Sequence, residues 1–114
     1  MVAAMLLSAD IWVGALIRRV EIGGAFAVVV RKGDPAAGAV LVKILNRGDG
    51  TARLLAEATK GDGDRIWMQP VASSAEADLD RYIERAVRID PDVWVVEIED
   101  REGRHFLVEP VEKG

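Results

Sequence analysis

The sequence predicts an α+β fold, in which one antiparallel sheet of five to six strands carries two helices on one face. Three observations predict it: two segments have apolar residues at helical spacing, several short segments are rich in Val, Ile and Leu, and Gly- and Asp-containing turns separate them. The expected order is helix, three or four strands, helix, two strands (α-β-β-β-β-α-β-β in full). The order of the strands across the sheet stays open.

The first helix is expected to begin at Asp10, whose carboxylate can accept hydrogen bonds from the free amides of a first helical turn. Apolar side chains with helical spacing follow, among them Trp12, Leu16 and Val20. The pair Gly23-Gly24 ends this helix, because glycine adopts a left-handed conformation at little cost.

Residues 25–30 form an uninterrupted apolar run rich in valine, which favours a strand. Because both faces of this strand are apolar, we expect it at the centre of the sheet or covered by a partner. Alternating segments follow at 40–45 and 52–57, with a short segment at 65–68. Their short connecting turns imply an antiparallel meander.

The second helix is expected after Ser73, which forms a capping box with Glu76. Its apolar stripe consists of Leu79, Tyr82, Ile83, Ala86 and Val87. Pro91 stops this helix, and residues 93–98 and 104–108 are then expected to pair as a hairpin. We therefore predict one domain over residues 10–109, a disordered lead over 1–9 in which Met5 is an alternative start, and a tail over 110–114.

Composition excludes several functional classes. The chain of 114 residues has no cysteine and one histidine, so disulfide frameworks, thiolate zinc sites and cysteine nucleophiles are ruled out. The net charge of −4 argues against a nucleic-acid partner. Residues 1–17 lack the basic start of a signal peptide, and Asp10 interrupts their apolar run, so we expect no membrane partner.

Several stretches carry a resemblance to a known family. They include Ile11-Trp12-Val13, the run from Arg31 to Lys43, Arg65-Ile66-Trp67-Met68 and the Ile-Asp-Pro-Asp to Glu-Asp segment that ends at Asp100. Over residues 11 to about 108 the chain resembles the bacterial family catalogued as domain of unknown function 1491. The resemblance implies a cytoplasmic bacterial protein and carries over no catalytic or binding residue.

The candidate catalytic and metal-binding residues are few. His105 is expected on the outward face of the last hairpin, without a partner to orient it as a general base. The acidic turn at Asp62 has Asp64 at the third position of a calcium loop but Ile66 at the fifth, so it fails that pattern. We therefore name no catalytic residue, no metal ligand and no cofactor.

One loop is a candidate ligand site. Glycine amides beside two cations can hold an anion, and such a set follows the first predicted strand. An outward-facing tryptophan from another strand could stack on a base or sugar. The candidate residues are Arg31, Lys32, Gly33, Asp34, Gly38 and Trp67.

Three functions remain as hypotheses. The first is a small non-catalytic interaction module that forms a homodimer, which rests on the two-sided apolar strand at 25–30 and on uneven charge. Residues 1–60 carry eight basic and five acidic groups, and residues 90–114 carry three basic and eight acidic groups. The second is a domain that binds a small anionic ligand or nucleotide at the loop. The third and weakest is an enzyme that uses paired carboxylates.

Overall fold

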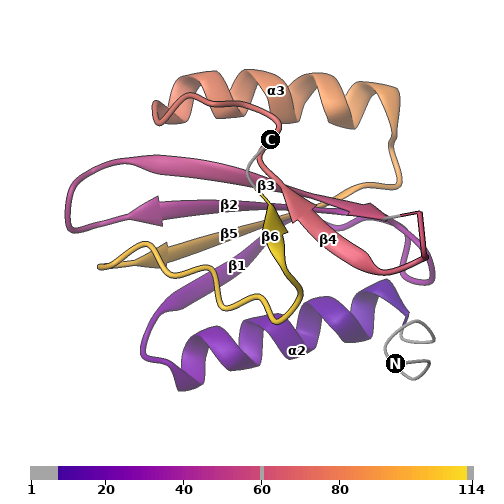
Figure 1. Cartoon of the computed structure of the whole chain (residues 1–114), viewed down its shortest axis with the longest axis horizontal. Coiled ribbons are helices and arrows are strands. Elements are labelled where there is room, and N and C mark those ends of the chain that lie inside the picture. The colour runs from indigo at the N-terminus through magenta and orange to yellow at the C-terminus, as the bar shows by residue number, and fades with distance from the viewer. Residues whose placement is uncertain (1–7, 60, 113–114) are drawn as a thin grey trace.

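In the computed structural model, which describes residues 8–59 and 61–112, a six-stranded sheet lies between two helices (Figure 1). The helices are α2 (Ala9–Ile22) and α3 (Glu76–Ile89). The strands are β1 (Phe26–Arg31), β2 (Val40–Asn46), β3 (Ala52–Thr59), β4 (Arg65–Met68), β5 (Trp94–Asp100) and β6 (Val111–Glu112). The predicted α+β class is confirmed, and so is the predicted order of elements as far as β5.

The sheet is mixed, so the prediction of a purely antiparallel sheet is wrong. The strand order is β1-β5-β2-β3-β4-β6. β5 pairs in parallel with β2, from Val40 opposite Trp94 to Asn46 opposite Asp100, and β6 pairs in parallel with β4. The physical reason is the crossover through α3, which returns the chain to the starting end of β2 and inserts β5 between β1 and β2.

The two helices cover opposite faces of the sheet, so their predicted placement on one face is also wrong. Along β2, Val40, Val42 and Ile44 belong to the core beneath α2. Leu41 belongs to the second core beneath α3. The central strands β2 and β5 are largely buried on both faces, so a helix must cover each face of the sheet (Figure 1).

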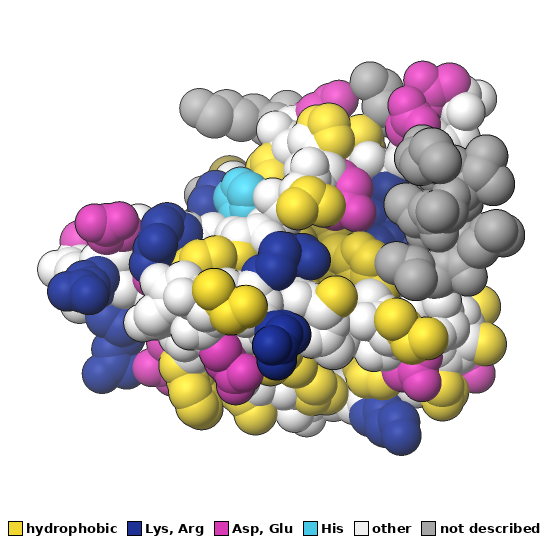
Figure 2. Space-filling view, turned by 90° about the horizontal axis from the view of Figure 1, so that it is seen from below, with side chains coloured by type: hydrophobic (Ala, Val, Ile, Leu, Met, Phe, Trp, Pro, Cys, Tyr) yellow, Lys and Arg dark blue, Asp and Glu magenta, His cyan; other side chains and the backbone are white. Residues whose placement is uncertain are grey.

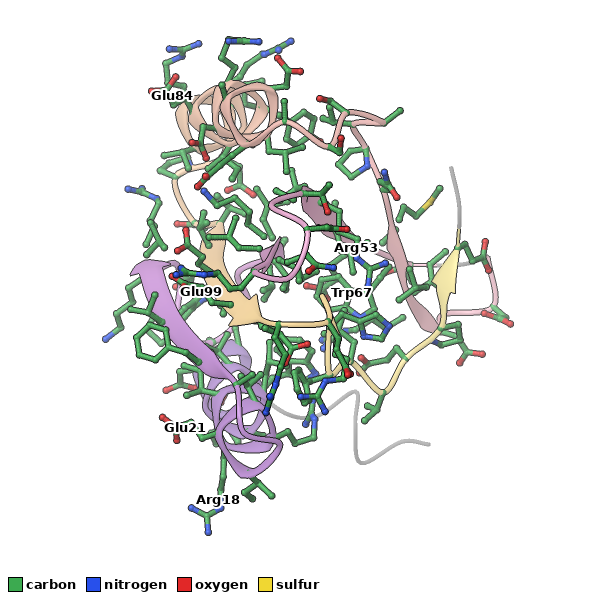
Figure 3. The ribbon with its side chains drawn as sticks, turned by 90° about the vertical axis from the view of Figure 1, so that its left-hand side faces the viewer. Arg18, Glu21, Arg53, Trp67, Glu84 and Glu99 are labelled. Carbon is green, nitrogen blue, oxygen red and sulfur yellow. The ribbon has the colours of Figure 1, made fainter. Side chains whose placement is uncertain are left out.

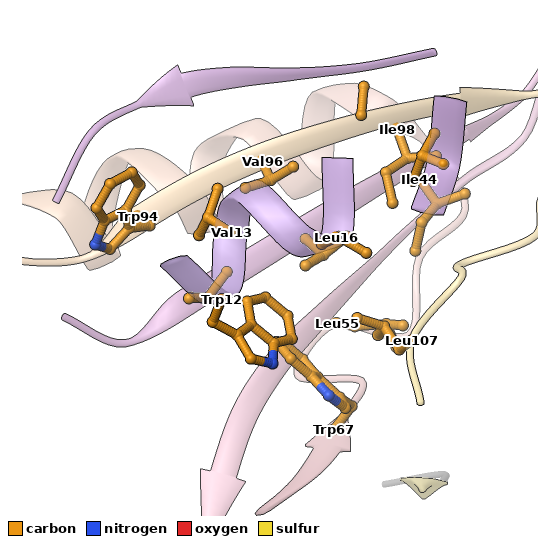
Figure 4. Close-up of a cluster of buried hydrophobic side chains, with 14 of the residues drawn as sticks. Trp12, Val13, Leu16, Ile44, Leu55, Trp67, Trp94, Val96, Ile98 and Leu107 are labelled. Carbon is orange, nitrogen blue, oxygen red and sulfur yellow. The ribbon is translucent and has the colours of Figure 1, made fainter. Parts of the chain in front are cut away.

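The core beneath α2 is built around the tryptophans (Figure 4). Trp12, Val13 and Leu16 of α2 pack toward the central strands, and Trp12 stacks on Trp67 with ring centroids 5.4 Å apart. Leu107 from the C-terminal segment is also in this core. The C-terminal segment therefore completes one of the two hydrophobic cores.

Both helices begin differently from the prediction. Ser8, not Asp10, occupies the N-cap position of α2, and Asp10 accepts hydrogen bonds from the Ser8 hydroxyl at 2.6 Å and the Ile11 amide at 2.8 Å. The capping box of α3 does not form. Ser73 instead donates to Asp78 at 2.6 Å, while the Glu76 carboxylate binds Lys43.

The predicted hairpin partner at 104–108 is not a strand. Phe106 adopts a left-handed backbone with φ of 60°, which interrupts an extended run. After β5 the chain turns at Asp100, whose carboxylate accepts from the amides of Glu102 and Arg104. It then crosses to the far edge of the sheet, where β6 lies within the segment predicted as the tail.

Candidate interaction surface

Strand β1 forms one edge of the sheet and presents an apolar row to solvent. Among the residues that the structure describes it pairs only with β5, and the fractional exposures are 58% for Phe26, 40% for Val28 and 58% for Val30. The alternate residues Ala27 and Val29 pack into the core beneath α2. One face of this strand is therefore buried, and the other exposes apolar side chains to solvent.

A groove runs beside this row, between β1, β5 and α3, with a volume of about 430 Å³. Its apolar walls come from Val30, Val95, Ile83 and Val87. Its charged walls come from Arg31, Glu84 and Arg88. Figure 3 shows β1 at the left of the view, with α3 above it and α2 below it.

We define the β1 surface as Phe26, Val28 and Val30 together with this groove. A register shift between Val29 and Arg31 marks a bulge at the C-terminal end of the strand. Bulges near strand ends limit how far an edge can be extended. The pairing-competent part of the edge is therefore short and centred near Val28.

The loop predicted to bind a ligand packs against the start of β5. The Asp34 amide donates to the Asp92 carbonyl at 2.9 Å, and the Asp34 carboxylate accepts from the Ala37 amide at 2.8 Å. A Cβ at Gly33 or Gly38 would lie 2.1 or 2.2 Å from the Asp92 oxygen, so both positions require glycine. Arg31 donates to the Pro91 carbonyl at 3.0 Å, and Lys32 is exposed.

Trp67 has 0% exposure beneath α2, so its predicted outward orientation is wrong. The alternation of β4 could not identify its outer side, because both faces of this sheet are covered. The structure brings Arg31, Lys32, Gly33, Asp34 and Gly38 together in one segment, with Trp67 apart from them in the tryptophan core. Ligand binding at the loop stays a prediction.

Sequence reasoning missed Glu109, which joins the two stacked tryptophans. Its two carboxylate oxygens accept from the indole N–H groups of Trp12 at 3.3 Å and Trp67 at 3.1 Å. Nearby, Arg65 lies over the Trp12 ring and pairs with Glu57 at 2.9 Å. Burial raises the pKa of Glu57, and the charge of Arg65 opposes that rise.

Lys43 is a second residue that the sequence did not single out. It is a buried cation on β2, whose ammonium lies 2.8 Å from Glu76, 2.8 Å from Asp80 and 3.3 Å from Glu97. Burial lowers its pKa, but the hydrogen bonds that the ammonium donates to the three carboxylates outweigh burial and raise the pKa above its usual value. The sequence did contain a signal for this ionic cluster, since Glu76 and Asp80 are one helical turn apart on the predicted helix.

His105 is half-buried rather than outward-facing, because no strand forms around it. Its Nδ1 accepts from the Leu107 amide at 2.8 Å, so this nitrogen carries no proton. Burial lowers the pKa of His105, and the charge of Arg53 lowers it further. The arrangement gives His105 a role in holding the C-terminal segment.

Two further properties concern the residues that the structure describes. No group of three His, Asp or Glu side chains in 8–59 and 61–112 is arranged to hold a metal ion. Within the same ranges, neither helix is long and apolar enough to span a membrane.

The fold defines a class of small α+β proteins, in which a mixed sheet lies between two helices. A model of the family described as "Protein of unknown function (DUF1491)" matches residues 7–108, and the chain belongs to this family. None of the curated proteins matches the chain.

Solved structures of relatives agree with this assignment. The crystal structure of a DUF1491 family protein from Caulobacter crescentus is 74% identical with a TM-score of 0.92, covering 94% of this chain and all of that one. An NMR structure of a DUF1491 family protein from the same organism has a TM-score of 0.89 at 74% identity, covering 94% and 97% of the two chains. A solution structure from A. tumefaciens is 35% identical, with a TM-score of 0.78 and coverage of 91% and 94%.

Proposed function

We propose that this protein is a non-catalytic interaction module that forms a homodimer through the β1 surface. The observation that carries the proposal is the row of exposed apolar side chains on an edge strand, since a free strand edge is a template for pairing with another chain. We also propose a cytoplasmic location, which rests on the family resemblance alone.

The spacing of the exposed residues supports a second copy as the partner. If two β1 strands pair antiparallel around a two-fold axis at Val28, each Val28 lies opposite the partner's Val28, and each Phe26 lies near the partner's Val30, where the bulge begins. All six exposed side chains then share one face and form aromatic and β-branched cross-strand pairs. The two sheets would continue as one across the contact.

The charges at the ends of β1 favour the same orientation. Arg31 and Lys32 lie at its C-terminal end, and Glu21 lies in the last turn of α2, just before its N-terminal end. An antiparallel pair brings the basic end of one copy to the acidic end of the other. A parallel pair would bring like charges together, which is unfavourable.

The size of the surface predicts a weak dimer. A stable interface buries roughly 800 Å² per partner. A six-residue strand edge supplies only part of that area, so the groove and the exposed Ile22 at the end of α2 must contribute. We therefore expect a dissociation constant in the micromolar range, which corresponds to a free energy of association of about −8 kcal/mol.

Sedimentation velocity over a range of concentrations tests the proposal. We expect the wild-type chain to shift from monomer to dimer, and Val28→Lys to remain monomeric because two ammonium groups would meet at the axis. The matched control is Ile11→Lys, which places the same charge at a 60% exposed position on α2 and should dimerise like the wild type.

A wild-type chain that stays monomeric at millimolar concentration would overturn the homodimer, as would dimerisation of Val28→Lys. A native mass spectrum of protein purified gently from its own host gives an independent measurement of the oligomeric state and of any bound ligand. A bare dimer supports the proposal. A retained adduct of a few hundred daltons would instead support the sequence-based hypothesis of an anionic ligand or nucleotide at the Arg31 to Gly38 loop.

A further inference from the structure

A cavity of about 250 Å³, with apolar and polar residues in its lining, lies at the end of the molecule that holds the β2–β3 turn, and β5 separates its strands from β1. It opens beside β3, where the segment between β4 and α3 leaves the sheet. Its lining includes Asn46, Arg53, Gln69, Ser73, Ser74 and Gly103. Ordinary ligand pockets measure roughly 300–1,000 Å³, so this cavity suits a small ligand or one group of a larger one.

Arg53 gives the cavity its charge. It is half-buried, and one terminal nitrogen donates to the Gly103 carbonyl at 3.2 Å. Arg53 forms no ion pair with any residue in 8–59 and 61–112. A partly buried cation without a counter-ion favours an anion, since desolvation of the charge is then offset.

Among the other polar groups of the lining, the Asn46 side chain presents a donor, whereas the hydroxyls of Thr51 and Ser73 and the amide of Gln69 already donate to groups outside the cavity. The Asn46 oxygen is occupied by the amides of Gly48 and Asp49, which turns its NH₂ group away from that turn and beside Gly103. None of the residues that line the cavity carries a carboxylate. Figure 2, drawn from the α2 side, shows several Lys and Arg side chains at this end of the molecule.

We infer that this cavity binds an oxyanion, either a phosphate group or a carboxylate, with Arg53 as the principal ligand. The guanidinium offers a planar fork that matches two oxygens of either group. The amide of Asn46 and the hydroxyl of Ser74 donate to the remaining oxygens. This site is distinct from the β1 surface and does not rest on the proposed homodimer.

The test is an NMR titration of the full chain with sodium phosphate and, separately, with sodium acetate, each at constant ionic strength against sodium chloride. We expect saturable shifts of the Arg53 Nε–H signal and of the Asn46 side-chain NH₂ signals with at least one anion. The arm that saturates at lower concentration distinguishes phosphate from carboxylate.

Three variants make the result specific. Arg53→Gln should weaken binding at least about tenfold, because it removes a charge-assisted pair of hydrogen bonds. Arg85→Gln removes an equally charged but exposed side chain on α3 and should bind like the wild type. Ser74→Ala, at an exposed position, should keep the fold and weaken binding several-fold, and it decides the matter if Arg53→Gln fails to fold.

Shifts that grow linearly with both anions without saturation would overturn the inference. So would saturable binding that is unchanged in both Arg53→Gln and Ser74→Ala.

Discussion

At the scale of single residues, Glu109 holds more of the structure together than its place in the C-terminal segment suggests. Each of its carboxylate oxygens accepts one indole N–H, from Trp12 and from Trp67. Glu109→Gln leaves one acceptor oxygen for two donors and sets an NH₂ group against an indole. We expect a loss of about 1–3 kcal/mol in the free energy of unfolding, measured by urea denaturation.

Glu84→Gln is the control for this change, because Glu84 is exposed on α3 and forms no hydrogen bond with tryptophan (Figure 3). It should unfold at the wild-type urea concentration. Equal stability of Glu109→Gln and Glu84→Gln would show that the indole hydrogen bonds contribute nothing.

His105 makes the stability depend on pH in a defined direction. The folded state lowers its pKa below the ordinary 6.5, so the unfolded chain binds the proton more readily. The stabilisation is therefore fully present above about pH 6.5 and is lost as the pH falls through the folded pKa. Protonation of Nδ1 also removes the hydrogen bond from the Leu107 amide.

We expect the urea midpoint to fall between pH 7 and pH 5, with a smaller fall in His105→Gln. The Leu107 amide signal should move with the same pH dependence as the His105 ring. A Leu107 amide that does not titrate would contradict this role.

Residue roles were predictable only where local pattern decides them. The buried position of Trp12 followed from periodicity. Trp67 did not, because alternation identifies the buried side of a strand only when the other side is solvated. Glu109 and Arg53 were out of reach, since their partners lie 42 or more residues away along the chain.

At the scale of elements, α3 is attached to the sheet by an ionic cluster as well as by its apolar stripe. Lys43 reaches from β2 to Glu76 and Asp80 on the helix. Lys43→Met keeps the aliphatic stem but leaves these carboxylates and Glu97 without a cation. Because Glu76 and Asp80 are half-exposed and can turn to water, we expect a loss of about 1–3 kcal/mol, below the full cost of breaking a buried pair.

Hydrogen exchange locates this effect, since the amides of α3 should lose protection more than those of α2. Lys32→Met is the matched control, because Lys32 is exposed and forms no ion pair with the residues that the structure describes. A uniform loss of protection in both helices would mean that Lys43 stabilises the whole molecule rather than the attachment of α3.

The elements themselves were mostly predictable, because their signals are local. The strand segments at 40–45, 52–57, 65–68 and 93–98 correspond to β2, β3, β4 and β5, and glycine or proline follows both helices. The predicted hairpin with a strand at 104–108 does not form, and the reason is physical. Its alternation is that of a strand, but Arg19 donates to the Phe106 carbonyl and Arg104 lies over the Phe106 ring, which fix a left-handed residue there.

At the scale of the whole molecule, the parallel pairing of β2 with β5 was not predictable from the segments. Parallel and antiparallel pairing of β2 with β5 would bury the same side chains, and only the path of the α3 crossover selects the parallel arrangement. The run at 25–30 was expected at the centre of the sheet or beneath a partner. It lies at an edge, so of the two expectations the partner is the one that still accounts for its exposed face.

The β1 surface and the Arg53 cavity have no lining residue in common and lie on different strands, so changes in one should not affect the other. Monomeric Val28→Lys should bind phosphate or acetate as the wild type does, and Arg53→Gln should dimerise with wild-type affinity. The double variant should show both losses with no additional effect, measured by sedimentation and by NMR titration of the same samples. If Val28→Lys also loses anion binding, the cavity is completed or ordered by the second copy, and the two surfaces belong to one site.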